Sequence, residues 1–105
     1  MILRICGRDF TVEKLESEPW SPSGMGRVQD KLGKITVCAS MPEDGQDGTL
    51  IHEVLHAIAD ETGIDCLNEN EQAISTLGCA LHAFIRDNSE VVKTWCERID
   101  KRSSK

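Results

Sequence analysis

The residues best suited to chemistry lie in the string His52-Glu53-Val54-Leu55-His56, which has the pattern HExxH. On a helix, positions 52 and 56 lie about 40° apart and one turn along the axis, so both imidazoles can bind one metal ion. Glu53 falls beside them, where its carboxylate can reach a metal-bound water and act as a general base. The pattern therefore predicts one Zn²⁺ ion that activates water for hydrolysis.

A catalytic zinc ion needs a third protein ligand, which must come from outside this helix. Glu71 is the favoured candidate, because a short turn after Gly63 would bring the start of the next helix close to His56. Three alternatives remain open in the same connection, namely Asp65, Cys66 and Glu69.

Glu71 also has a purely structural interpretation. Asn68-x-x-Glu71 matches a capping box, in which the glutamate serves the helix N-terminus and binds no metal. The third histidine, His82, would lie ~16 Å further along the same helix than Glu71, so the two cannot share an ion. We expect His82 to be a helix-face histidine with a polar partner.

The helix that carries HExxH is predicted from the apolar periodicity of TLIHEVLHAIADETG. Asp44 and Asp47 are both suitable N-caps, and Gly63 is suited to the C-cap. The face opposite the histidines carries Ile51, Val54, Leu55 and Ile58. We expect that face to pack on the core, which gives the helix a core side and a metal side.

Two further helices are expected downstream. The helix over residues 69–86 has apolar residues at helical spacing, namely Ile74, Leu77, Leu81, Phe84 and Ile85. Glu71, Gly78 and His82 fall within about 20° of one line on this helix, bordered by Ile74, Leu77 and Leu81. We expect this line to face the first helix, with Gly78 allowing close approach. The helix over residues 89–100 places Val92, Trp95 and Ile99 on one face.

The first third of the chain is β-prone. Residues 2–6, 10–15, 27–30 and 34–38 are short strand-like runs separated by turn signals. The sequence thus predicts an α+β fold, a small antiparallel sheet followed by three helices. With 105 residues, it fits a single domain over 1–105, β-rich over 1–38 and helical over 43–101.

The charge balance argues against a nucleic-acid partner. Twelve Lys and Arg residues against eighteen Asp and Glu give a formal net charge of −6, which repels phosphate. Positive charge gathers only at residues 93–105, where five basic residues oppose two acidic ones. A regulator that binds nucleic acid through this basic tail is the weakest of the functions considered, because such a tail is typical of a solvated terminus.

Cysteine usage and the N-terminus suggest where the protein works. The five cysteines are odd in number and include no close pair, so we expect reduced thiols that act as small hydrophobes. The first residues lack the pattern of a secretory signal, and no apolar run is long enough to span a membrane. We therefore expect a cytoplasmic protein with no membrane partner.

The segment around HExxH resembles the small gluzincin-type metallopeptidases, especially the compact HExxH proteins of phages and prophages related to the ImmA/IrrE group. The likeness covers residues 35–88: the TLI-HEVLH-AI string, the Gly63-Ile64 stop, and Glu71 leading a periodic helix that ends at Arg86-Asp87-Asn88. It implies a zincin-like fold with His52, His56 and Glu71 as zinc ligands and Glu53 as the base.

The same resemblance implies how a substrate would be held. The strand before the motif, residues 35–38, would be the rim strand that binds an extended peptide by strand addition. Larger gluzincins usually supply a tyrosine or histidine to stabilise the oxyanion, whereas this chain has no tyrosine. The substitutes available are Arg27, Lys34, Arg86 and His82.

Two functions of different class follow. The first is zinc-dependent hydrolysis of peptide bonds in a peptide or protein substrate. The second is a non-enzymatic, zinc-stabilised protein-interaction module that has kept the metallopeptidase fold. The sequence leaves the substrate and the oligomeric state open.

Overall fold

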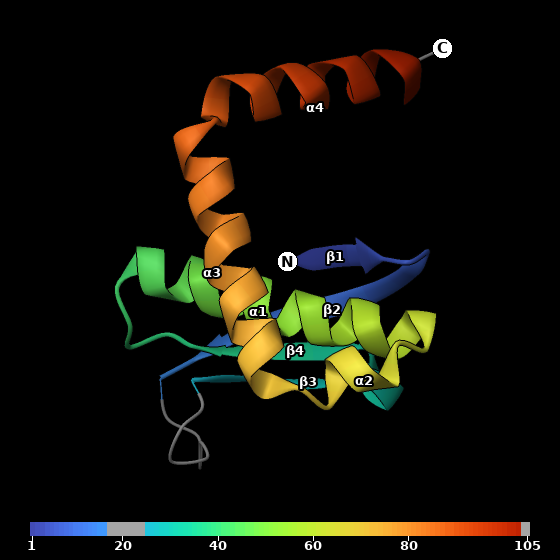
Figure 1. Ribbon diagram of the computed structural model, residues 1–105, viewed down its shortest axis with the longest axis vertical. Coiled ribbons are helices and arrows are strands. Elements are labelled where there is room, and N and C mark those ends of the chain that lie inside the picture. The colour runs from blue at the N-terminus through green and yellow to red at the C-terminus, as the bar shows by residue number, and fades with distance from the viewer. Residues whose placement is uncertain (17–24, 104–105) are drawn as a thin grey trace.

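Strands and then helices follow one another along the chain, giving an α+β architecture (Figure 1). The computed structural model describes residues 1–16 and 25–103. The strands are β1 (Ile2–Ile5), β2 (Arg8–Leu15), β3 (Gly26–Gln29) and β4 (Lys34–Cys38), with a short 3-10 turn at Asp30–Leu32. The helices are α1 (Glu43–Thr62), α2 (Asp65–Asn68), α3 (Glu71–Asp87) and α4 (Ser89–Ser103).

The sheet is mixed, and the prediction of an antiparallel sheet was wrong in one pairing. Its strand order is β1-β2-β4-β3. β1 pairs with β2 and β3 pairs with β4 in the antiparallel sense, but β2 and β4 run parallel. The chain leaves β2, runs back along the outer strand β3 and then inserts β4 between them. β4 is therefore an interior strand, and β3 is an edge.

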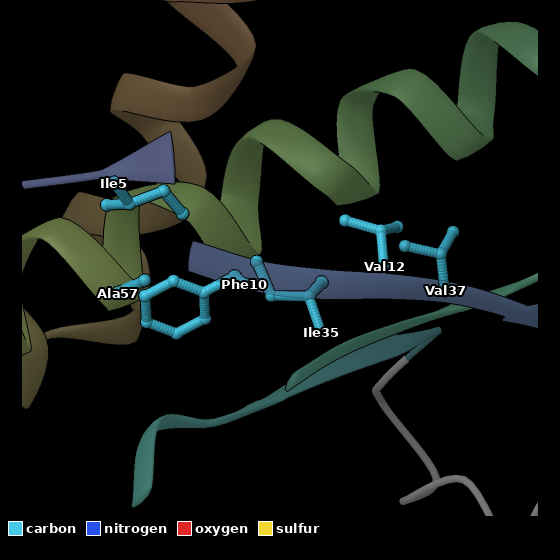
Figure 2. Close-up of a cluster of buried hydrophobic side chains, with 6 residues drawn as sticks. All are labelled: Ile5, Phe10, Val12, Ile35, Val37 and Ala57. Carbon is cyan, nitrogen blue, oxygen red and sulfur yellow. The ribbon is translucent and has the colours of Figure 1, made fainter. Parts of the chain in front are cut away.

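A cluster of buried apolar side chains fills the layer between the sheet and α1 (Figure 2). Phe10 and Ile35 have no exposed surface, and Phe10 lies beside Ala57 of α1. The cluster consists of Ile5, Phe10, Val12, Ile35, Val37 and Ala57. This core fixes α1 across the face of the sheet and so positions the HExxH residues.

α1 is turned differently from the predicted orientation. Its buried residues are Glu53, Ala57 and Ala59, and Val54 packs against the core from its edge. Ile58, expected in the core, is 36% exposed. Small alanines let the helix sit close to its neighbours, whereas the larger isoleucine is left on the outer side. The core side thus includes Glu53 and overlaps the side predicted for the metal.

The two ends of α1 differ in how well the sequence predicted them. The helix begins at Glu43 after Pro42, which makes no side-chain cap hydrogen bond, so Asp44 and Asp47 lie within the helix and are not N-caps. Gly63 is the C-cap, as predicted, with a left-handed φ of 74°. Arg8 of β2 donates to Glu61 at 2.7 Å and ties this end of α1 to the sheet.

α3 crosses α1 and continues beyond it, carrying α4 away from the sheet (Figure 1). Only Ile74 and Gly78 of α3 are buried. The predicted line of Glu71, Gly78 and His82 faces α1. The larger apolar residues of α3 stay partly exposed, at 37–49% for Leu77, Leu81, Phe84 and Ile85. A Cβ added at Gly78 would lie 3.7 Å from the Cα of His52, an ordinary contact, so alanine would also fit there.

The cysteines are free thiols, and the expectation that they serve as small buried hydrophobes holds only for Cys38. The exposed ones are Cys6, Cys66, Cys79 and Cys96. None of the helices among residues 1–16 and 25–103 combines the length and hydropathy needed to cross a membrane.

Candidate metal centre

Three side chains from two helices converge beside the sheet. The Nε2 atoms of His52 and His56 on α1 lie 2.5 and 2.9 Å from the two carboxylate oxygens of Glu71, the first residue of α3. Candidate ligand atoms of these three residues all lie within 4.8 Å of one another. They form the one group of this kind found within residues 1–16 and 25–103.

Asn68 determines which ring nitrogen of His56 carries a proton. The Nδ1 atom of His56 lies 2.8 Å from the side-chain oxygen of Asn68. That oxygen can only accept, so Nδ1 donates its proton to it. In a neutral imidazole the other nitrogen, Nε2, then carries a lone pair, which is directed at the Glu71 carboxylate 2.9 Å away.

A lone pair facing a carboxylate is stable only with a cation between them, either a proton on the imidazole or a metal ion. Two histidine nitrogens and one carboxylate oxygen are a recurrent donor set for catalytic zinc, which leaves a fourth position open. A hydrogen bond from the far nitrogen of a ligand histidine is also typical of zinc sites. The residues present therefore fit a zinc ion.

Glu53 lies next to this group but on the side of α1 that faces the sheet. It is only 7% exposed, and its Cγ is 3.4 Å from the position that a Cβ on Gly26 would take. Burial raises the pKa of Glu53, and the Glu71 charge raises it further, while the two histidines act in the opposite direction. A carboxyl group that binds a proton more readily is a better acceptor in general base catalysis.

An open cavity of about 770 Å³ connects the histidines with the edge of the sheet. Met25, Gly26, Arg27 and Val28 line it from β3 and the residue before it. The other lining residues are Thr49, His52, Glu53, His56, Glu71 and Ser75. The convergent polar groups thus lie beside an edge strand, where an extended chain has room to bind.

The capping-box interpretation of Glu71 was wrong. Asn70 is the N-cap of α3, and its side chain accepts a hydrogen bond from the backbone of Ala73 at 3.0 Å. Asn68 belongs to α2 and binds His56 instead. The Glu71 carboxylate, 67% exposed, is therefore free of a capping role and reaches both histidines. The alternatives Asp65, Cys66 and Glu69 do not join the group.

His82 lies elsewhere on the α1–α3 contact. The ring of His82 lies against Gly48 of α1, where a Cβ added to the glycine would be 3.4 Å from the Nδ1 of His82. The Nε2 of His82 is 3.5 Å from Asp44. Contacts along the two helices run in opposite order, since Glu71 meets His56 while His82 meets the beginning of α1. This arrangement agrees with the prediction of a helix-face histidine with a polar partner.

The four cationic candidates for oxyanion stabilisation differ in how close they lie to the cavity. Arg27 lines the cavity. Lys34 pairs with Glu13 at 3.2 Å, and Arg86 lies 3.9 Å from Asp87 near the far end of α3. With His82 placed beside Gly48, Arg27 is the candidate among these four that borders the cavity.

Sequence reasoning missed two features of the site. Asn68 was assigned to a cap, although an asparagine just upstream of a candidate ligand also suits hydrogen bonding to a ligand histidine. The rim strand was assigned to residues 35–38, but β4 is enclosed by β2 and β3, and β3 borders the cavity.

No protein-family model matches this sequence, and no curated protein and no solved structure is significantly similar to it.

Proposed function

We propose that this protein is a zinc-dependent peptide hydrolase with a minimal zincin-like fold of the gluzincin type. The observation that carries the proposal is the convergence of His52, His56 and Glu71 on one point, with the buried Glu53 beside them and an open cavity in front. Ligands, a candidate base and space for a substrate thus occur at one place.

His52, His56 and Glu71 would hold the ion. A zinc ion bound there would polarise the scissile carbonyl and make water more acidic. Glu53 accepts the proton of the attacking water and delivers it to the leaving amine. Its burial against β3 restricts the positions open to the carboxylate, and the same burial raises the pKa of Glu53.

The substrate would lie along β3. This strand is an edge of the sheet, so its outer backbone groups can pair with an extended peptide. β4, which the family resemblance suggested for this role, has both sides occupied. A peptide on β3 would pass in front of Glu53, because Gly26 brings the strand's backbone close to that side chain.

A non-enzymatic, zinc-stabilised interaction module is the second candidate function. The half-exposed apolar residues of α3 and α4 favour it, since such surfaces mark contacts with other proteins. In that case the ion would serve only to join α1 and α3, and Glu53 would be dispensable.

The first experiment measures zinc by elemental mass spectrometry after dialysis of the purified protein. We expect about one zinc ion per chain in the wild type and a marked loss in Glu71→Gln. Glu69→Gln is the matched control, because Glu69 is a neighbouring acid outside the group. Equal zinc content in the two variants, or none in the wild type, would overturn the three-residue site.

The second experiment separates the two functions. Glu53→Gln should retain zinc and lose cleavage of a fluorogenic peptide library, because the amide cannot accept the proton of water. If the zinc-loaded wild type and Glu53→Gln are equally inactive on the library, the hydrolase proposal fails and the interaction module remains.

A further inference from the structure

α4 is an amphipathic helix whose apolar face stays largely uncovered by residues 1–16 and 25–103. Trp95 and Ile99 are 46% and 57% exposed. Its substantial contacts with other elements are with α3, where Trp95 stacks on Phe84 with ring centroids 6.4 Å apart. This stack places Trp95 beside the exposed apolar end of α3.

Two arginines give this surface a charge. Trp95, Arg98, Ile99 and Arg102, here called the α4 face, line a shallow hollow of about 300 Å³. At 100° per residue they fall within about 100° of one another on the helix. A partner that covers the α4 face must therefore supply apolar side chains together with carboxylates.

The outer side of α1 has this composition. Asp44, Asp47, Ile51 and Ile58, here called the α1 stripe, fall within about 60° of one another at 100° per residue. Ile51 is half-buried, Ile58 is 36% exposed and both aspartates are exposed. Asp44 also lies 3.5 Å from His82 of α3, so Asp47 is the aspartate of the stripe that has no ion-pair partner among the described residues. The acidic residues stand at the N-terminal end of the stripe and the isoleucines follow.

The order of charge along the two helices fixes how they would pair. On α4 the aromatic residue comes first and the arginines follow, whereas on α1 the aspartates come first. If the helices run antiparallel, Arg98 and Arg102 meet Asp44 and Asp47, and Trp95 meets the isoleucines. Opposite charges and apolar surface are then matched in one arrangement.

The partner cannot be the α1 of the same chain in this conformation. α3 holds α4 away from α1 and the sheet (Figure 1), and the molecule is elongated, 44 Å against 29 and 26 Å. Its radius of gyration of 14.5 Å exceeds the ~13 Å typical of a compact chain of this length. A second copy can supply the missing stripe and receive α4 in return around a two-fold axis.

We propose that the protein forms a reciprocal homodimer in which the α4 face of each copy packs antiparallel on the α1 stripe of the other. The cavity beside β3 and the metal group lie on other sides of α1, so the contact leaves them open. Two such helix pairs would cover the exposed Trp95, Ile99 and Ile58 of each copy.

The test is the mass in solution of the full-length protein, by sedimentation velocity over a range of concentrations. We expect a species of twice 11.6 kDa that dissociates more readily as salt is raised, because charge pairs contribute. Trp95→Asp should yield monomer, whereas Lys93→Asp, on the opposite side of α4, should leave the dimer intact. A wild type that stays monomeric at all concentrations overturns the proposal.

Charge exchange tests the pairing itself. Arg98→Asp and Asp47→Arg should each weaken the dimer by about tenfold or more, and the double variant should restore it. Both positions are exposed, and circular dichroism checks that each variant is folded. A dimer that Trp95→Asp breaks but Asp47→Arg does not affect would mean that α4 packs on another surface, such as a second α4, and would overturn the assignment to α1.

Discussion

His56 is the central side chain of the candidate site, because its two ring nitrogens contact an amide and a carboxylate. Asn68 accepts its Nδ1 proton, and the opposite nitrogen faces Glu71. Asn68 thus acts through His56, as a positioning residue: it fixes the tautomer and the plane of the ring. Its neighbour Asn70 caps α3 and contacts neither histidine in this way.

Replacing Asn68 should weaken zinc binding. We expect Asn68→Ala to lower the affinity by about 10- to 100-fold, the usual effect of losing a hydrogen-bond partner of a ligand histidine. Competition with a chromogenic chelator measures it. Asn70→Ala should instead cost about 1 kcal/mol of stability through the lost cap and leave zinc affinity near wild type. Equal affinities for both variants would contradict the role given to Asn68.

Arg27 is the residue that we expect to stabilise the oxyanion. Since it borders the cavity, Arg27→Gln should lower kcat by about 100-fold, the usual cost of one oxyanion donor, with zinc content unchanged. Lys34→Gln is the control, because Lys34 is a basic residue of the same sheet that does not line the cavity. Steady-state kinetics on the best library peptide decide the matter, and an equal loss in both variants would count against Arg27.

At the scale of elements, hydrophobic periodicity identified the three long helices and the line along which α3 meets α1, but not the face that α1 buries. α1 packs through Ala57 and Ala59 because small side chains allow close approach, and this leaves Ile58 outside. On α3 the predicted line through Glu71 and Gly78 does meet α1, with Ile74 buried beside it, while the larger apolar residues stay partly exposed. Periodicity shows that a face exists, but the partner that covers it depends on packing beyond the helix.

In the sheet, the positions of the strands could be predicted from local sequence, but their pairing could not. The four strands were predicted close to their observed positions, since β-branched runs and turns are local signals. Pairing between β2 and β4 is set by where the intervening strand β3 docks. The sequence feature of β4 is the uninterrupted β-branched run Ile35-Thr36-Val37. These residues and Cys38 are all buried, as is typical of strands covered on both faces.

One position in β4 is not optimal for stability. Thr36 has no exposed surface, and within the described part of the chain its hydroxyl has no hydrogen-bond partner. We expect Thr36→Val to raise the free energy of unfolding by about 1 kcal/mol, because an unpaired buried hydroxyl is removed at nearly constant shape. Urea denaturation measures the change. Thr11→Val, at an exposed strand position, should change stability by less than about 0.5 kcal/mol.

At the scale of the molecule, the candidate ion would join two helices that differ in position, one packed in the core and one that projects from it. α1 belongs to the core, while α3 carries α4 outward, and the ligands link them at the base of α3. Local sequence signals predicted all three candidate ligands because they lie close together along the chain. How far α3 projects beyond α1 could not be predicted, since it depends on the angle at which the two helices cross.

Zinc should therefore stabilise the whole fold. With free zinc at 100 times its Kd, we expect about 2.7 kcal/mol of added stability, a rise in Tm on the order of 10 °C. Thermal unfolding with zinc and with a chelator measures this difference. It should vanish in His56→Gln and persist in His82→Gln, whose side chain contacts Asp44. An equal zinc effect in both variants would contradict the assignment.

All the candidate ligands and the asparagine that orients His56 fall between residues 52 and 71, across one short connection. An ion that binds there closes a short loop, which costs little chain entropy. The pairing of β2 with β4 joins residues 23 apart, such as Thr11 and Lys34, and it requires a whole strand to align and not just three side chains. Metal added before refolding would thus assemble the α1–α3 corner early, and the time course of folding would depend on the order in which zinc and buffer are mixed.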